Sequence, residues 1–479
     1  MKATQCFYNN MAIKQLYLNG FSHHLCGSAS RNKASELARR ACELGGLSTL
    51  AGRFFSNNLL ASAPGSRNRD FPLLVTFWAF FSQVLTRNAS CRAAVAGVQA
   101  WRASRNTRMP SDGTSAYCQA RSRLPLDCLR AIFTAIGAWI SKHDSGDALL
   151  NGRIVRVVDG TGVSMPDTAA NRKKWPCAGN QKPGCGFPVI QLAGLFCLQS
   201  GRLIKFAFGS WKERESVLAR QLVGWLGKGE VLLADRGFCG WGFMALLQRK
   251  GVDVVFRLQQ FRKNRPGRHV WEKPRRTESW GKRLWRELPA QITVRILSFD
   301  VHVKGFRSRR ITLCTSLLDS KAYPDEALIA LYMRRWKIEL FFRDIKTTLG
   351  LDVVRCQTPA MVEKEIWMQA IAYNTVRALM LEAALSHGVS VERLSFKGTV
   401  DMMRTWAGCM HHDKPGINKH LLSELLLAIA SEQVPLRPCR AEPRCRKRRP
   451  KDYQYLTKPR HAMAPFKLRR KKMTTSALI

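Results

Sequence analysis

Residues 332–346 have the sequence Tyr-Met-Arg-Arg-Trp-Lys-Ile-Glu-Leu-Phe-Phe-Arg-Asp-Ile-Lys. In a helix with about 100° per residue, four of their polar side chains fall within about 60° of one another, namely Tyr332, Arg335, Glu339 and Lys346. The apolar residues centre roughly 100° away, which predicts a buried stripe made of Leu331, Ile338, Phe341, Phe342, Ile345 and Leu349. A carboxylate flanked by two cations and a phenol suits a phosphate-bearing substrate beside a metal ion. Ordinary ion pairs on an exposed face have the same spacing, so the segment alone leaves both interpretations open.

The composition points to nucleic acid as the partner. The chain has 479 residues, of which 46% are hydrophobic, so it can bury a large core in about two to four domains. It carries 78 Lys and Arg against 34 Asp and Glu, a net charge of +44. A compact protein with this charge repels itself unless a polyanion neutralises it, and Lys and Arg displace counterions from DNA phosphates.

No membrane partner is expected. The apolar run 72–85 is too short to cross a bilayer and is typical of a buried helix. The N-terminus lacks the continuous apolar core of a secretory signal. The 15 cysteines are scattered without a Cys-x-x-Cys pair, which argues against a zinc module and against a disulfide framework. These features predict a cytoplasmic protein with reduced thiols.

The sequence pattern divides the chain into four regions. Residues 1–148 are expected to form a helical N-terminal domain that binds DNA. Residues 149–385 show three strands, a helix, a strand, a helix and a strand, which predicts an α/β sheet sandwiched by helices, with a β-rich insertion at about 259–312. Residues 386–436 return to helical patterns. The tail 437–479 has 15 Lys or Arg and only two acids, so we expect it to be disordered.

Two acids end predicted strands of this sheet. Asp159 follows a β-branched run, and Asp235 follows a short apolar one. If the two strands are parallel neighbours, both carboxylates meet at one edge of the sheet, where ligands of α/β proteins bind. Glu339 would complete a triad, and three like charges at short range repel unless a cation lies among them. Each Asp alone also fits a turn, and Asp167 is the best rival of Asp159.

These motifs resemble those of the DDE transposases of the insertion-sequence-4 family, the bacterial cut-and-paste class. The family signature Tyr, two residues, Arg, three residues, Glu, six residues, Lys is matched without a gap in residues 332–346. The first family acid stands in an Asp-Gly-Thr context, here residues 159–161, and the second in an Ala-Asp-Arg context, here residues 234–236. The resemblance covers residues 115–385.

The resemblance implies a ribonuclease-H-like catalytic core with the β-rich insertion between the second Asp and the Glu. By this likeness, Asp159, Asp235 and Glu339 would hold two divalent cations, Mg²⁺ or Mn²⁺. The expected activity is metal-dependent cleavage at transposon ends, followed by strand transfer into target DNA. The expected location is the bacterial cytoplasm, in association with the nucleoid.

The resemblance also implies how DNA is held. Tyr332, Arg335 and Lys346 would contact phosphates at the transposon end. Further DNA contacts are expected from nearby basic residues, namely Arg236, Arg262, Lys263 and Arg265. The partner would be double-stranded DNA, as terminal inverted repeats bound by residues 1–148 and as target. A homodimer would pair two ends in a synaptic complex.

Some members of the family pass through a hairpin end with a base flipped onto a Trp of the insertion. Trp271, Trp280 and Trp285 lie in that region here, and packing within the insertion's own core is the competing interpretation. Two other functions stay open. A related nuclease would use the same triad without strand transfer, and a DNA-binding or repressor protein would have lost the chemistry. The intact triad argues against the repressor.

Overall fold

The computed structural model describes residues 44–61, 70–144, 150–177, 184–259, 265–300, 310–410 and 415–435, together with Leu456, Lys458, Pro459 and Ala462. Residues 1–43 and nearly all of the predicted basic tail lie outside the described residues. The same is true of Arg262 and Lys263 in the predicted basic loop.

One mixed sheet organises the described chain. Its order is β3-β2-β1-β4-β5-β8-β7-β6, in which β1, β4 and β5 are parallel and the other pairings are antiparallel. The strands are β1 Val155–Ser164, β2 Val189–Cys197, β3 Leu203–Ser210, β4 Val231–Ala234, β5 Asp253–Arg257, β6 Gly267–Glu272, β7 Gln291–Asp300 and β8 Arg310–Thr315. An antiparallel β1–β3 meander followed by parallel β4 and β5 is the ribonuclease-H-like arrangement that the sequence predicts.

The predicted alternation of strands and helices is confirmed, with differences in extent. The helix expected before β4 is shorter and is divided into α9, Glu215–Arg220, and η2, Val223–Trp225. The first strand does not end at residue 159, because the antiparallel partner β2 continues the ladder as far as Ser164. The predicted insertion forms no sheet of its own, because β8 pairs with β5 and extends the same sheet.

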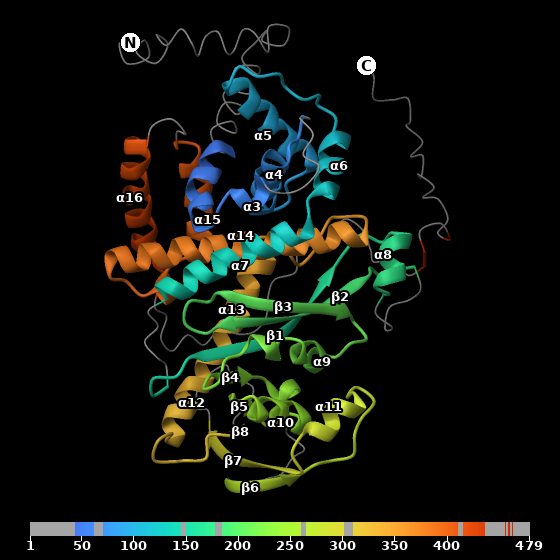
Figure 1. Cartoon of the computed structure of the whole chain (residues 1–479), viewed down its shortest axis with the longest axis vertical. Helices are drawn as coiled ribbons and strands as arrows, with labels where there is room; N and C mark the ends of the chain where they lie inside the picture. The colour runs from blue at the N-terminus through green and yellow to red at the C-terminus, as the bar shows by residue number, and fades with distance from the viewer. Residues whose placement is uncertain are drawn as a thin grey trace, which may run out of the picture.

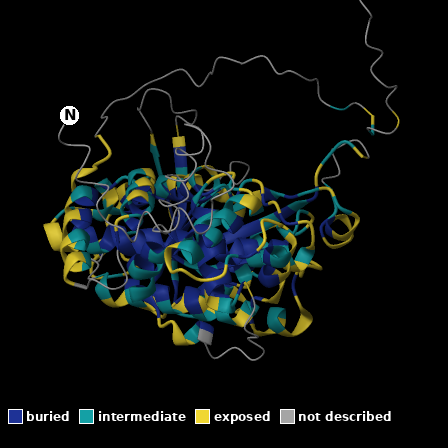
Figure 2. Ribbon diagram, turned by 90° about the horizontal axis from the view of Figure 1, so that it is seen from above, coloured by how far each residue is buried: buried dark blue, intermediate teal, exposed yellow. Residues whose placement is uncertain are grey.

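Helices cover both faces of the sheet. The first hydrophobic cluster joins Val157 and Phe196 to α7, Leu126–His143, and to α14, Pro359–His387. The second cluster joins Val158 and Leu232 to α9 and to α10, Trp241–Arg249. Neighbouring residues of β1 point to opposite faces, so alternation along the strand sorts its apolar side chains between the two cores. Figure 2 shows these buried segments in the interior.

Helix α14 connects the sheet to the remaining helices. It begins with Pro359 in its first turn and ends at Gly388, whose φ of 62° lies in the left-handed region that favours glycine. Figure 1 shows α14 and α7 between the sheet and a group of helices from both ends of the chain. That group contains α3 Asn58–Ala61, α4 Leu73–Leu85, α5 Cys91–Ser104, α6 Ser115–Arg123, α15 Phe396–Ala407 and α16 Pro415–Ser431.

The segment quoted first is helical but is not one regular α-helix. It consists of α12 Asp325–Met333, the 3₁₀ turn η4 Arg334–Trp336, α13 Lys337–Arg343 and the π turn η5 Asp344–Thr348. The predicted apolar stripe is confirmed, since all six of its residues are buried. The four polar side chains of this segment differ in exposure more than a regular helix predicts. Tyr332 and Arg335 are 1% and 4% exposed, whereas Glu339 is exposed. Changes of helical pitch at η4 and η5 rotate the side chains away from the expected positions.

The structure also locates the apolar run that the sequence assigns to a buried helix. The run around residues 72–85 forms the buried helix α4. Among the described helices, none by itself is long and apolar enough to span a membrane, although α6 and α7, bent by 70°, pass that test as a pair. Every cysteine of the described residues for which a state is assigned has a free thiol.

Candidate active site

Asp159 and Asp235 come together because β1 and β4 are parallel neighbours, which the sequence left as a condition. Their register pairs Val157 with Leu233, and extending it by two residues aligns Asp159 with Asp235. Adjacent strands lie about 4.8 Å apart, and aligned residues point to the same face. Strand β4 ends at Ala234, so Asp235 stands just beyond the carboxyl end of the strand. Ligands of α/β sheets bind at such ends.

Glu339 joins this pair from α13. Burial raises the pKa of Asp159, and the negative charges of Asp235 and Glu339 raise it further. The backbone N–H of Gly160, which donates to Oδ1 of Asp159 at 2.8 Å, and the charge of Arg335 act in the opposite direction. The three acids of the predicted triad therefore share one electrostatic environment, although they are distant in sequence.

Arg335 lies beside Asp159. Its Nη1 lies 3.8 Å from Oδ2 of Asp159, and its guanidinium lies 5.5 Å from the Tyr332 ring centroid. Burial raises the pKa of Tyr332 to about 12, so the phenol stays protonated near neutral pH. The Tyr332 hydroxyl and Nε of Arg335 are buried without a hydrogen-bond partner. Buried polar atoms of this kind are rare, and they mark positions where a further partner can bind.

Lys346 reaches the Asp-Gly-Thr motif from the π turn η5. Its Nζ donates to Oγ1 of Thr161 at 2.9 Å, so two motifs separated by 185 positions in sequence are in direct contact. A buried ion pair holds η5 in place, because Nη2 of Arg377 in α14 lies 3.0 Å from Oδ2 of Asp344. Burial raises the pKa of Asp344, and the charge of Arg377 opposes this shift. Lys346 is half-buried at the edge of the site.

The acids offer oxygen ligands to a hard cation. Oδ1 of Asp235 is buried and has no hydrogen-bond partner. A buried carboxylate oxygen is rarely left without a partner, and a bound cation would provide one. Among the described residues, no group of three or more His, Cys, Asp or Glu side chains converges closely enough to hold a metal ion as it stands. The donor set fits Mg²⁺ or Mn²⁺ by its chemistry, and closure around a cation requires side-chain rotation.

One acid near the triad has no sequence motif. Glu215, the first residue of α9, accepts a hydrogen bond from Nε2 of Gln191 at 2.6 Å. Burial raises the pKa of Glu215, and the charges of Asp159 and Asp235 raise it further. No spacing rule links Glu215 to the triad, so only the fold reveals that it lies near these acids.

The rival features lie elsewhere. Asp167 forms an ion pair with Arg172 at 3.1 Å, and the charges that shift the pKa of Asp159 do not include it. Trp280 and Trp285 pack against each other with ring centroids 5.3 Å apart, within the second hydrophobic cluster. Trp271 packs against the same cluster, and its carbonyl accepts a hydrogen bond from Trp241.

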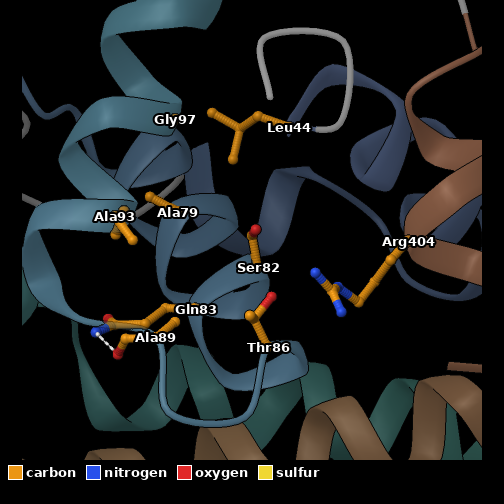
Figure 3. Close-up of a pocket in the computed structure, with 10 residues that line it drawn as sticks. Leu44, Ala79, Ser82, Gln83, Thr86, Ala89, Ala93, Gly97 and Arg404 are labelled. Atoms are coloured by element: carbon orange, nitrogen blue, oxygen red, sulfur yellow. Dashed lines mark hydrogen bonds between the residues drawn. The ribbon is translucent and has the colours of Figure 1, made fainter. Parts of the chain in front are cut away.

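A cavity of about 120 Å³ lies away from the acids, between α4, α5 and α15 (Figure 3). It is lined by Leu44, Ala79, Ser82, Gln83, Thr86, Ala89, Ala93, Ala94, Gly97 and Arg404. No carboxylate is among these residues, so the cavity contributes nothing to the acid site.

Of the further basic residues predicted to contact DNA, Arg236 and Arg265 are exposed.

Comparison with known proteins gives an independent result. Residues 150–375 match the family described as Transposase DDE domain. The chain is 27% identical over 414 residues to the Escherichia coli (strain K12) protein "Transposase InsG for insertion sequence element IS4", covering 83% of this chain and 90% of that protein. The cryo-EM structure of a piggyBac transposase synaptic complex with hairpin DNA has a TM-score of 0.40 at 9% identity, covering 81% of this chain and 84% of that one.

A ribonuclease-H-like sheet with acids gathered at its β1 and β4 strands, together with the domain match, defines a DDE transposase. The relationship to the InsG protein extends along most of the chain, through the helices on both sides of the catalytic core. Residues 150–375 therefore carry a transposase DDE domain, and most of the chain is similar to a transposase of insertion sequence element IS4. Enzymes of this class cut and join DNA with the help of divalent metal ions.

Proposed function

We propose that Asp159, Asp235 and Glu339 hold two divalent cations, Mg²⁺ or Mn²⁺, for cleavage at transposon ends and strand transfer into target DNA. The observation that carries the proposal is the parallel pairing of β1 with β4, whose register, continued two residues past its last pair, aligns Asp159 with Asp235. The negative charge of Glu339 acts on the same Asp159 carboxylate. The unpartnered Oδ1 of Asp235 supports it. Because Glu339 is exposed on α13, a change of its side-chain rotamer can bring its carboxylate toward Asp159.

Bound cations of this kind activate a water or a 3′-hydroxyl and stabilise the leaving oxygen of a phosphodiester. The protein's own residues position the DNA for this displacement. Arg335 adds a positive charge beside Asp159, and its guanidinium, which is 4% exposed, must turn outward to contact a phosphate oxygen directly. The Tyr332 hydroxyl lies buried next to it, so a phosphate contact would require Tyr332 to become exposed when DNA binds. Lys346 contacts Thr161 of the Asp-Gly-Thr motif and supplies a compact positive charge for another phosphate.

The remaining DNA surface is proposed from charge. Arg236 directly follows Asp235, and both Arg236 and Arg265 are exposed, so they can neutralise phosphates flanking the scissile position. Arg262 and Lys263 belong to the same proposal by sequence alone. We expect residues 1–148 to bind the terminal inverted repeats and two protomers to pair the ends. The site of action would be nucleoid DNA in the bacterial cytoplasm.

The test uses DNA that carries the element's own ends. Isosteric variants Asp159→Asn, Asp235→Asn and Glu339→Gln should each reduce Mg²⁺-dependent nicking by at least about 10³-fold, because each removes one charged ligand. DNA binding should remain within about threefold, since most of the affinity comes from Lys and Arg. Asp167→Asn is the matched control, because this acid is paired with Arg172 outside the site.

Each outcome separates the functions considered. Loss of nicking in the three triad variants with normal nicking by Asp167→Asn supports the proposal. Nicking at the wild-type rate by all four variants would show that the chemistry lies elsewhere. Cleaved ends that never join to target DNA would indicate a nuclease, and binding without metal-dependent cleavage would indicate an inactive DNA-binding derivative.

A further inference from the structure

We infer that Glu215 is a fourth carboxylate of the cation site, and that it increases the affinity of that site for divalent cations. The inference rests on the proposed function, because it assumes that Asp159 and Asp235 bind the cations. Glu215 belongs to none of the sequence motifs and lies between β3 and β4, at the start of α9.

The glycine of the Asp-Gly-Thr motif makes room for this carboxylate. A Cβ at residue 160 would lie 2.2 Å from Cδ of Glu215 and 2.3 Å from its Oε1. Any other residue at position 160 would therefore fill the space that the carboxylate occupies directly beside Asp159. Gln191 of β2 fixes the carboxylate there, with its Nε2 donating to Oε1 at 2.6 Å.

Glu215 approaches from the face of the sheet opposite to Glu339. Along β1, alternation directs Asp159 toward the α13 side and Gly160 toward the α9 side. Strand β4 ends at Ala234, so the sheet is open next to Gly160. The carboxylate of Glu215 lies next to Gly160 at this end of the sheet, close enough to Asp159 and Asp235 for their charges to act on it.

The electrostatics agree with this geometry. The charged groups that raise the pKa of Glu215 are both acids, Asp159 and Asp235. Like charges held together in a half-buried position repel, and a cation among them converts the repulsion into attraction. Oδ1 of Asp235, buried without a partner, is the oxygen that such a cation would satisfy.

The experiment is a Mn²⁺ titration of the full-length protein, with free Mn²⁺ measured by its electron paramagnetic resonance signal. Glu215→Gln keeps the shape of the side chain and can still accept from Gln191, so it removes only the charge. We expect it to weaken Mn²⁺ binding roughly tenfold. The matched control is Glu213→Gln, because Glu213 lies two residues away and binds the Ser210 backbone instead, with N–H to Oε1 at 3.1 Å. The control should bind Mn²⁺ like the wild-type protein.

Asp159→Asn separates this inference from the proposed function. If Asp159→Asn loses Mn²⁺ affinity and Glu215→Gln does not, Glu215 has no part in the cation site while the proposed function stands. If neither variant changes the affinity, the proposed function itself fails. Gly160→Ala should displace the carboxylate and reproduce the weakened binding of Glu215→Gln.

Thermal unfolding distinguishes a cation ligand from a structural residue. With a chelator present, Glu215→Gln should unfold at a higher temperature than the wild-type protein, because one of the repelling charges is gone. Added Mn²⁺ should stabilise the variant less than the wild type. A variant that unfolds at a lower temperature both with and without Mn²⁺ would indicate a structural role and overturn the inference.

Discussion

Replacing Arg377 with Met should destabilise the protein by about 3 kcal/mol, at the lower end of the cost of breaking a buried ion pair. The substitution removes the buried counter-ion of Asp344 and leaves only the mostly exposed Arg343, whose Nη2 lies 3.7 Å from Oδ1 of Asp344. Nη2 of Arg377 lies 3.0 Å from Oδ2 of Asp344, and each side chain is only 8% exposed. Nε of Arg377 also donates to the Tyr373 hydroxyl at 3.1 Å, and its guanidinium lies 4.9 Å from the Phe341 ring centroid. Methionine fills the space but replaces none of the polar contacts.

The loss should extend to the active site. Asp344 is the first residue of η5, and Lys346 follows two positions later. Release of η5 from α14 should weaken the contact between Lys346 and Thr161, so nicking at transposon ends should fall even where the protein remains folded. The double variant Arg377→Met with Asp344→Leu should regain much of the lost stability, because apolar replacement of a whole buried pair is often neutral.

The assay is urea unfolding of the full-length protein, followed by tryptophan fluorescence at several pH values. Without Arg377, the pKa of Asp344 should rise further above its unfolded value, so the variant is most stable where Asp344 is protonated. Its deficit relative to the wild-type protein should be largest near pH 7 and should shrink as the pH falls through the raised pKa. A deficit below about 1 kcal/mol at pH 7 would refute the buried-pair reasoning.

Four further substitutions test separate features. Lys346→Met should reduce nicking and end binding in gel-shift assays while the unfolding midpoint stays within about 1 kcal/mol of wild type, because Lys346 is half-buried at the site's edge. Gly46→Ala should cost about 1–3 kcal/mol in urea unfolding, since a Cβ would lie 1.7 Å from the Ala407 carbonyl oxygen. Gly97→Ala is the contrasting case: no atom lies within 4 Å of a Cβ at residue 97, so the alanine should stabilise α5 by about 0.5–1 kcal/mol. Arg236→Ala should lower the slope of log affinity against log salt by about one unit in DNA titrations, and an unchanged slope would exclude a phosphate contact.

The catalytic core was predictable because its signals are local or fixed in spacing. Apolar runs that end in acids, with helical patterns between them, predicted strands at Asp159 and Asp235, whereas the parallel pairing that aligns the two acids is given by the fold. The apolar period of the segment around Glu339 predicted which side chains are buried. These features depend on short-range periodicity, which a single sequence records directly.

The remaining features depend on tertiary context. The extent of β1 beyond Asp159 follows from its pairing with β2, which no local pattern in β1 reports. The burial of Tyr332 at the end of α12 and of Arg335 in the η4 turn depends on what packs against them, which the helical period of the segment does not report. The position of Glu215 depends on the missing side chain at Gly160, a contact between residues 55 positions apart, of which only Gly160 belongs to a sequence motif.

Anomalous diffraction from crystals of the protein bound to a transposon end and Mn²⁺ would measure the cation positions directly. Two anomalous peaks should lie within about 2–2.6 Å of carboxylate oxygens from Asp159, Asp235 and Glu339. Peaks coordinated by other residues, in crystals whose DNA is cleaved, would contradict the assignment of these three acids.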